Sequence, residues 1–305
     1  MSRPLASVVS QVDHIVVGKQ RQISLSLACL LARGHLLIED LPGVGKTTLA
    51  HALAKSLGLD FQRIQFTSDL LPADILGVSV FDRDTSSFKF HPGPVFSNVI
   101  LADEVNRATP KAQSALLEAM EEHQVTTEGQ TRRLPEPFFV IATQNPSYQV
   151  GTFPLPESQL DRFLMRIQLG YPDTEAERIL LEGRERRDMI ADLAPVLSAA
   201  ELIQLQKRAR EVFAAPALLD YVQALISYTR ECADFVTGLS PRAGLFLLNA
   251  ARAWAFMDGR REVIPEDVQA VLPSVAEHRL HSVNGLASLP SAELAQRLIE
   301  EVAIP

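Results

Sequence analysis

Short apolar runs alternate with helical spacing of apolar residues over the first half of the chain. Between the first two runs, residues 47–57 place Leu49, Ala50, Leu53 and Leu57 on one helix face, and Gly58 follows as a terminator. This alternation is typical of a mainly parallel sheet covered by helices. The strands expected are His35–Glu39, Phe61–Phe66, Asn98–Ala102, Phe138–Thr143 and Phe163–Ile167.

Two stretches interrupt the alternation, and both predict protruding hairpins. Val80–Phe96 contains a polar turn and then Pro-Gly-Pro, and Val125–Pro135 is centred on Glu-Gly-Gln. After residue 172 only helical spacing remains, punctuated by prolines. We therefore expect an α/β fold in two parts: a parallel-sheet domain over residues 1–172 with inserted hairpins, and a smaller all-helical domain over residues 173–305.

Charge and composition exclude several classes of protein. The 305 residues include 29 Lys plus Arg and 37 Asp plus Glu, a formal net charge of −8. A protein that held nucleic acid mainly by its phosphates would carry a basic surplus, so strong nucleic-acid binding is not expected. The longest apolar stretch, Ile23–Ala32, is shorter than the roughly 20 residues that span a bilayer.

The amino-terminal residues and the cysteines indicate the compartment. The first residues do not lead into an apolar core with a small-residue cleavage site, so no secretory signal is indicated. Cys29 and Cys232 lie far apart in apolar helical segments, which makes a disulfide implausible and fits a reducing environment. We expect a cytoplasmic protein without a membrane span.

The segment between the first strand and the following helix has the composition of a phosphate-binding loop. Its backbone N–H groups and the helix N-terminus would bind phosphates, with Lys46 on the β- and γ-phosphates and the Thr47 hydroxyl on Mg²⁺. The generic pattern has glycine at the first position, where this chain has Asp40. The alternative is an ordinary turn between strand and helix. The candidate nucleotide-binding residues are Pro42, Gly43, Val44, Gly45, Lys46, Thr47 and Thr48.

Polar residues end two further strands and complete a candidate hydrolytic site. Asp103 would join the Mg²⁺ shell, and the adjacent Glu104 would polarise a water molecule. Alone, such a pair could instead cap the helix that begins near Thr109. Asn145 ends the strand Phe138–Thr143, and ligands gather at the carboxyl ends of parallel strands. It is therefore placed to touch the γ-phosphate or the water, or else it is a turn residue before proline.

Four segments, in the expected order, resemble the MoxR family of AAA+ ATPases. The similarity runs from about Val17 to the C-terminus, and an acidic residue before the Pro-Gly pair is familiar in that family. It implies a P-loop sheet with a helical lid, ATP and Mg²⁺ as ligands, and hydrolysis in a homo-oligomeric ring, a hexamer. The segments are Glu39–Thr47, Asp103–Ala108, Ala142–Pro146 and Leu155–Phe163.

The resemblance also implies roles for individual residues. Asn145 resembles the first sensor, and Val17 and Gly18 resemble the segment that lies against adenine. Arg162 resembles the arginine finger, which acts on the nucleotide of the neighbouring subunit. Two alternatives to this role are a local pair between Arg162 and Asp161 and a seam contact made by Arg107.

Arg242 resembles the second sensor, which reaches from the lid to the phosphates. Ser240 is a good N-cap and Pro241 a good first helical residue, so Arg242 falls in the first helical turn. A cation there opposes the helix dipole unless an anion lies nearby. The alternative is an arginine that faces solvent.

The leading hypothesis is ATP hydrolysis coupled to remodelling or maturation of a partner protein. The resemblance implies partners that carry a von Willebrand factor A domain. A second hypothesis is a nucleic-acid motor, which the net charge and the few cations of the second hairpin disfavour. A third is a scaffold gated by ATP with little turnover, which Glu104 and Arg162 disfavour.

Several other residues fit plain structural roles. Alternation of apolar residues in the first hairpin indicates packing of the insert on its own domain rather than a grip on substrate. His278, His281 and the Glu121–His123 segment are expected at the surface, and Trp254 in the core. The hairpin residues concerned are Phe81, Phe88 and Phe90.

Overall fold

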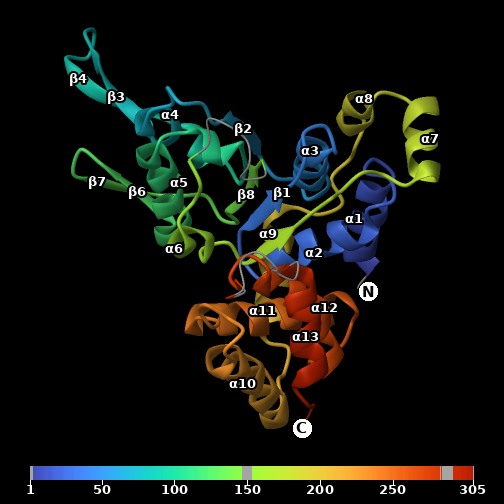
Figure 1. The fold of residues 1–305 in the computed structure, drawn as a ribbon. Coiled ribbons are helices and arrows are strands. Elements are labelled where there is room, and N and C mark those ends of the chain that lie inside the picture. Colours follow the sequence, from blue (N-terminus) through green and yellow to red (C-terminus); the bar gives the residue numbers. More distant parts are fainter. Residues whose placement is uncertain (1–2, 146–152, 282, 284–290, 305) are drawn as a thin grey trace.

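A five-stranded parallel sheet forms the centre of the molecule. The computed structural model describes residues 3–145, 153–281, 283 and 291–304. The strand order is β2–β5–β8–β1–β9, and Figure 1 shows helices on both sides of the sheet. The five predicted strands are confirmed, with ends shifted by one or two residues. Their bounds are β1 Leu36–Glu39, β2 Phe61–Gln65, β5 Val99–Asp103, β8 Phe139–Gln144 and β9 Met165–Ile167.

Side chains of successive strand residues enter two different cores, one on each face of the sheet. Leu36 and Ile38 belong to the larger cluster, whereas Leu37 between them belongs to the smaller one. This is the period of two that a strand buried on both faces requires. The larger cluster includes α1 (Arg3–Asp13), α2 (Gln20–Leu31) and α3 (Lys46–Ser56), and the smaller includes α4 (Pro72–Leu76) and α5 (Pro110–Glu122).

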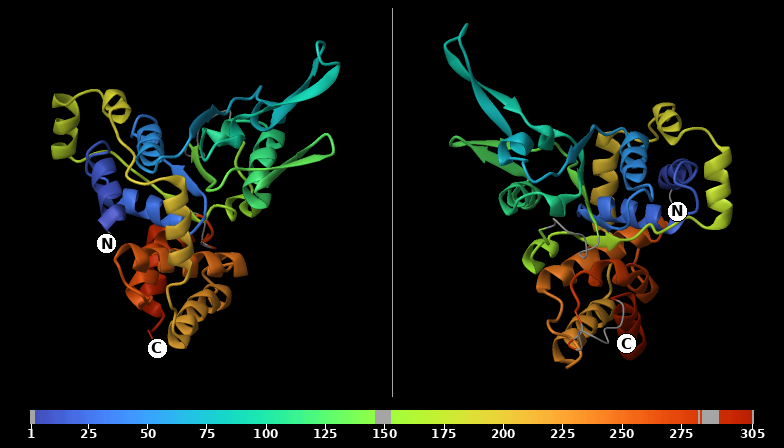
Figure 2. Two further views of the ribbon diagram at one scale, coloured as in Figure 1. Left: turned by 180° about the vertical axis from the view of Figure 1, so that it is seen from behind. Right: turned by 45° about the horizontal axis from the view of Figure 1, so that its top comes forward.

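Both predicted hairpins are present and project from the same side of the body (Figure 2). The first pairs β3 (Gly77–Asp82) with β4 (Ser87–Pro92), and the second pairs β6 (Gln124–Thr127) with β7 (Gln130–Arg133). The first begins three residues earlier than the pattern indicated. It starts at Gly77, whose φ is +98° and where a Cβ atom would lie 2.4 Å from the His91 carbonyl oxygen.

The expected packing of the hairpin phenylalanines is right for one residue and wrong for two. Phe90 packs edge-to-face on Phe96, and the guanidinium of Arg132 from the second hairpin lies 3.8 Å from the centre of its ring. Phe81 and Phe88 pack on each other but are 51% and 73% exposed. They lie beyond the point where the hairpin leaves the body, so no core is within reach.

Every element described after β9 is a helix, as expected. The prolines at the starts of α10, α11 and α12 occupy the first turn, where the missing N–H costs nothing. In Figure 1, α10 to α13 lie below the sheet, whereas α7 and α8 lie beside α1 and α3. The bounds are α7 Thr174–Glu182, α8 Arg186–Ala191, α9 Ala199–Arg210, α10 Pro216–Glu231, α11 Pro241–Met257, α12 Pro265–Ala276 and α13 Ser291–Glu301.

Smaller expectations are also tested by these helices. Trp254 packs, half-buried, against the larger core, and both cysteines are free. Within the described ranges, no helix combines the length and the apolar character needed to cross a bilayer. The division at residue 172 stays a prediction.

His35 fixes the beginning of β1. Its ring is buried, the Val140 N–H donates to its Nδ1 at 3.0 Å, and its Nε2 therefore carries the proton donated to the Met120 carbonyl at 3.3 Å. The two bonds can form together only on the neutral imidazole ring, because a protonated Nδ1 could not accept the Val140 N–H. Burial lowers the pKa of His35 from 6.5 to about 4.

We predict that the free energy of unfolding falls as the pH drops from 6.5 to about 4. The unfolded ring binds a proton in this window and the folded ring does not, a difference of about 3 kcal/mol. In His35→Gln, the free energy of unfolding should decline less with falling pH. Denaturant unfolding at several pH values measures this decline. His91→Gln, on the exposed surface of β4, should leave it unchanged. An unaltered decline in His35→Gln would contradict the assignment.

Candidate active site

The carboxyl ends of β1, β5, β8 and β2 meet at one edge of the sheet. Glu39 pairs with Gln144, and Gln65 pairs with Asp103, so these strands end side by side. The loop 40–45, the Asp103–Glu104 pair and Asn145 follow directly from these ends. The structure thus brings together the three segments that the sequence singled out.

The glycine loop leaves room for an anion. Gly43 and Gly45 have φ values of +84° and +97°, and a Cβ atom built at either would have no heavy atom within 4 Å. Gly45 is the N-cap of α3 and supplies no side-chain cap, so the first-turn N–H groups remain for a ligand. A helix N-terminus of this kind favours phosphate. Pro42 is exposed beside it, and Val44 is half-buried.

Lys46 is folded into the loop that it follows. Its side chain is buried, and its Nζ donates to the carbonyl oxygens of Asp40 at 2.7 Å and Leu41 at 2.9 Å. Burial lowers the pKa of the ammonium group, and nearby carboxylates, Asp40 first, oppose that shift. Thr47 and Thr48 are half-buried in the same helical turn. The loop therefore has a buried cation at its centre.

Asp40 explains the departure from the generic loop pattern. Its Oδ1 accepts from the N–H of Leu41 at 2.8 Å, and its Oδ2 accepts from the N–H groups of Leu169 and Gly170 at 2.6 and 2.7 Å. Glycine could make none of these bonds. The carboxylate fixes the start of the loop to the segment that follows β9.

The Asp103 carboxylate is buried and shared between two donors. The Thr143 hydroxyl donates to Oδ1 at 2.6 Å, and the Arg63 guanidinium donates to Oδ2 through Nε at 3.0 Å and Nη2 at 2.6 Å. A carboxylate oxygen is a hard ligand of the kind that Mg²⁺ takes. Arg63 lies on the neighbouring strand β2 and is a contact that the sequence pattern did not reveal.

Glu104 is held by three side chains. Its carboxylate accepts from Gln65 at 3.0 Å, Arg107 at 2.9 Å and Asn145 at 3.0 Å. Its backbone is left-handed, with φ +57°, which is uncommon for glutamate. Thr109, not Glu104, caps α5 through its side chain, so the capping alternative is wrong. Glu104 and Asn145 do come together, as expected.

Arg63 and Gln65 are the site residues that sequence reasoning missed. They lie two residues apart on β2, and Arg63 also donates to Gln65 at 2.6 Å. Polar residues at alternate positions near a strand end were a signal. This pattern alone does not place Arg63 and Gln65 at the site. They reach it because β2 pairs with β5, and that pairing is a long-range contact.

Arg162 and Arg242 converge on a single carboxylate, Glu121 at the end of α5. Arg162 lies 3.0 Å from Glu121 Oε2, and Arg242 donates to Oε1 at 2.6 Å. The local pair of Arg162 with Asp161 is therefore wrong. Residues 121–123 are exposed, as expected, and Glu121 in addition pairs with both arginines. Arg242 is exposed, as the solvent-facing alternative has it, and in addition pairs with Glu121.

The two arginines lie at the opposite end of β1 from the glycine loop. Together with Gly34 and His35, which precede the strand, they line a cavity of about 230 Å³. The glycine loop follows the other end of the strand. Arg107 likewise pairs with a carboxylate of its own chain, Glu104, at the carboxyl end of the sheet.

Val17 and Gly18 form the turn between α1 and α2. A Cβ atom at Gly18 would lie 3.2 Å from that of Ala176 on α7. The neighbouring Lys19 Nζ donates to the Tyr171 carbonyl at 2.8 Å. Tyr171 directly follows Gly170, which Asp40 binds. This turn is thereby connected to the glycine loop.

The residues present fit a nucleotide with Mg²⁺. The open glycine positions, the uncapped helix and the buried Lys46 suit phosphates, and Asp103 suits the metal. Among the residues that the structure describes, no group of three His, Cys, Asp or Glu could hold a metal by itself. A Mg²⁺ ion here would take phosphate oxygens as further ligands.

Comparison with known proteins agrees with this geometry. Residues 35–165 match the family model of the ATPase family associated with various cellular activities (AAA), and residues 227–302 match the AAA lid domain. The chain is 44% identical to the uncharacterized protein YeaC of Bacillus subtilis, covering 99% of this chain and 95% of that protein. It is 41% identical to the chaperone MoxR1 of Mycobacterium tuberculosis, covering 99% of this chain and 82% of that protein.

A solved structure shares the whole fold. A protein of Cytophaga hutchinsonii described as an ATPase superposes with a TM-score of 0.89 at 36% identity, covering 99% of this chain and 95% of that one. The sheet and the helical lid are therefore arranged alike in both.

We predict that Asp40→Gly, which restores the generic loop pattern, lowers the free energy of unfolding by about 2 kcal/mol. It removes a charged acceptor and leaves the N–H groups of Leu169 and Gly170 without it. Asp40→Asn keeps one acceptor oxygen, so its free energy of unfolding should lie between those of the parent and of Asp40→Gly. Urea unfolding measures the difference. If Asp40→Gly is as stable as the parent, the three hydrogen bonds make no net contribution to the free energy of unfolding.

Proposed function

Because the chain belongs to the MoxR family of AAA ATPases, we propose that it hydrolyses ATP with Mg²⁺ in a homo-oligomeric ring. One observation carries this proposal: Arg162 and Arg242 lie at the opposite end of β1 from their own glycine loop. The four residues of β1, at about 3.3 Å each, separate the two ends by ~13 Å. A nucleotide on the loop would therefore receive its arginines from a neighbour.

The arrangement supports a closed ring. An interface in which the arginine end of one subunit meets the loop end of the next is heterologous, and such contacts close when the rotation permits. We take six subunits from the family resemblance. The described helices contain no membrane span, and we place the protein in the cytoplasm.

Each residue of the site has a proposed task. Lys46 and the N–H groups after Gly43 bind the phosphates, and Val17 and Gly18 lie against adenine. Thr47 and Asp103 would hold Mg²⁺, which would neutralise phosphate charge. The remaining residues act on the reacting atoms.

Glu104 accepts a proton from the attacking water, and Asn145 orients that water or the γ-phosphate. The bonds from Gln65 and Arg107 occupy Oε2 of Glu104. Asn145 donates to Oε1, which keeps a second acceptor position for the water. The guanidinium groups of Arg162 and Arg242 stabilise charge that develops on the γ-phosphate of the adjoining subunit.

Hydrolysis drives remodelling or maturation of a partner protein in this proposal. A relative at 41% identity is named a chaperone, and the family resemblance suggests partners with a von Willebrand factor A domain. The first hairpin supports a protein partner, because it presents exposed apolar side chains away from the body: Val78, Val80, Phe81 and Phe88.

We predict that Arg162→Ala binds ATP as the parent does but turns over about a thousandfold more slowly. Lys46→Ala should lose nucleotide affinity. Equimolar mixing of the two inactive variants should restore part of the turnover, because some sites then combine an intact loop with an intact arginine.

Phosphate release measures turnover, and titration with a fluorescent ATP analogue measures affinity. Arg210→Ala, at an exposed position on α9, is the matched control and should match the parent. Parental turnover in Arg162→Ala, or mixtures that stay inactive, would overturn the shared site.

We also expect weak binding of single-stranded DNA. Arg132, one of two arginines in the second hairpin, lies over Phe90 and donates to Thr127 and Gln130, so it is engaged within the protein. Fluorescence anisotropy at 50 and 200 mM salt tests this. Tight binding that weakens steeply with salt would favour a nucleic-acid motor instead.

A further inference from the structure

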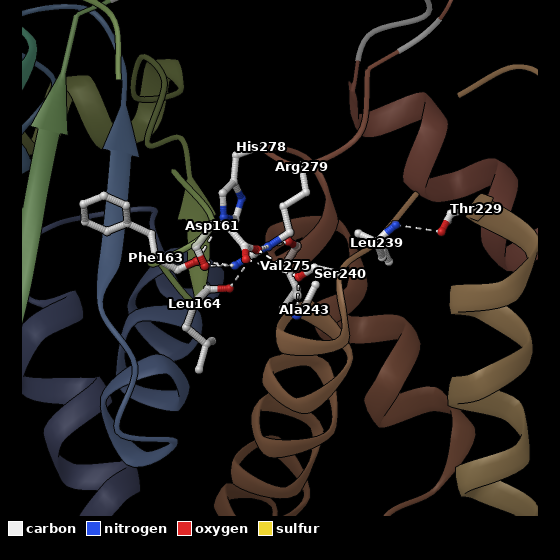
Figure 3. Close-up of polar contacts among 10 residues, drawn as sticks. All are labelled: Asp161, Phe163, Leu164, Thr229, Leu239, Ser240, Ala243, Val275, His278 and Arg279. Atoms are coloured by element: carbon white, nitrogen blue, oxygen red, sulfur yellow. Dashed lines mark hydrogen bonds and ion pairs between the residues drawn. The ribbon is translucent and has the colours of Figure 1, made fainter. Parts of the chain in front are cut away.

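Asp161, the residue before Arg162, joins the sheet domain to the helical lid. Its Oδ1 accepts from Arg279 Nε at 2.7 Å, and the Ser240 hydroxyl donates to its carboxylate at 3.2 Å. Figure 3 shows Arg279 and Ser240 reaching Asp161 from two different lid segments. Ser240 precedes α11 and Arg279 follows α12.

Arg279 fixes the main chain on both sides of Arg162. Its side chain is 5% exposed, and its Nη2 donates to the carbonyl oxygens of Asp161 at 3.0 Å and Phe163 at 2.6 Å. Nη1 donates to Val275 and, at 3.4 Å, to Leu164. All these acceptors converge on one planar guanidinium (Figure 3). A buried cation without them would be strongly destabilising.

His278 completes the contact without adding charge. Its Nε2 lies 3.0 Å from the Phe163 carbonyl and donates to it. Burial holds the pKa of His278 well below its usual value, so the ring beside Arg279 is neutral. The sequence interpretation of His278 as a surface residue is therefore wrong, whereas His281 is half exposed.

Ser240 places Arg242 relative to the same carboxylate. Its hydroxyl accepts from the Ala243 N–H at 3.0 Å as the N-cap of α11, whose first turn contains Arg242. The preceding residue, Leu239, is bound from α10: the Thr229 hydroxyl accepts its N–H at 2.9 Å, and Arg230 donates to its carbonyl at 3.0 Å. The start of α11 is thus fixed on both sides.

We propose that Asp161 and Arg279 are positioning residues that hold Arg162 and Arg242 in one fixed geometry, so that both guanidinium groups enter a neighbour's nucleotide site together. This inference rests on the proposed function. Asp161 contacts Arg279 and Ser240, and the Arg279 side chain is buried against the same chain, so we assign neither residue a contact with phosphate. They affect turnover only by placing the two guanidinium groups. A displacement of a catalytic group by about 1 Å lowers the rate on the order of a hundredfold.

Two substitutions at Ser240 separate positioning from folding. Asparagine and aspartate are both good N-caps, so either keeps the start of α11. Ser240→Asn retains a donor for Asp161, whereas Ser240→Asp sets a second carboxylate against it. We expect kcat within twofold of the parent for Ser240→Asn and at least tenfold lower for Ser240→Asp, with the same nucleotide affinity in both.

Mixed rings provide the second measurement. Arg279→Met should lose turnover about a hundredfold while its glycine loop still binds ATP. Adding Lys46→Ala subunits should restore turnover, because their arginines are correctly placed for the variant's loop. Adding Arg162→Ala subunits should restore none, because both variants are impaired on the arginine side.

The outcomes distinguish the two proposals. Parental turnover in Ser240→Asp while Arg162→Ala is slow would overturn the positioning role alone. Lower nucleotide affinity in Ser240→Asp, or failure of Lys46→Ala to restore Arg279→Met, would also overturn it, because either indicates a general structural fault. Parental turnover in Arg162→Ala itself would instead overturn the proposed function.

Discussion

The geometry of one short strand constrains everything else in this molecule. β1 separates the glycine loop at its carboxyl end from the cavity that Arg162 and Arg242 line at its amino end. Parallel strands gather ligand groups at their carboxyl ends, and Lys46, Asp103, Glu104 and Asn145 lie there. Arg162 and Arg242 lie at the other end, which is why the proposed function has them act on a second molecule.

Four arginines at or near the candidate site are paired with carboxylates of the same chain. Arg63 binds Asp103, Arg107 binds Glu104, and Glu121 binds both Arg162 and Arg242. Glu121 reduces the repulsion between its two arginines. A phosphate presents more charge and more acceptor oxygens than a carboxylate, so in the proposed ring a neighbour's nucleotide would compete with Glu121 for the same guanidinium groups.

Local patterns and long-range contacts differ in how far they could be predicted. The strands, the glycine loop and Lys46 follow from neighbouring residues, so the sequence predicted them. Asp40 departs visibly from the loop pattern, but two of its three partners, Leu169 and Gly170, lie about 130 residues away.

The same limit applies to the arginines and their partners. Arg242 and Glu121 are 121 residues apart, and Arg279 and Asp161 are 118 apart. No periodicity encodes such pairs. His278 was misplaced for the same reason, because the carbonyl that it binds belongs to Phe163 in the other part of the chain.

The segment from Asp161 to Gly170 is held at both ends by side chains from elsewhere in the chain. At its beginning, Arg279 binds the carbonyl groups that flank Arg162. At its end, Asp40 of the glycine loop accepts the N–H groups of Leu169 and Gly170. Between them lies β9, whose pairing with β1 is fixed by register. The position of the arginine is therefore tied, through one paired strand, to the loop that would bind this subunit's own nucleotide.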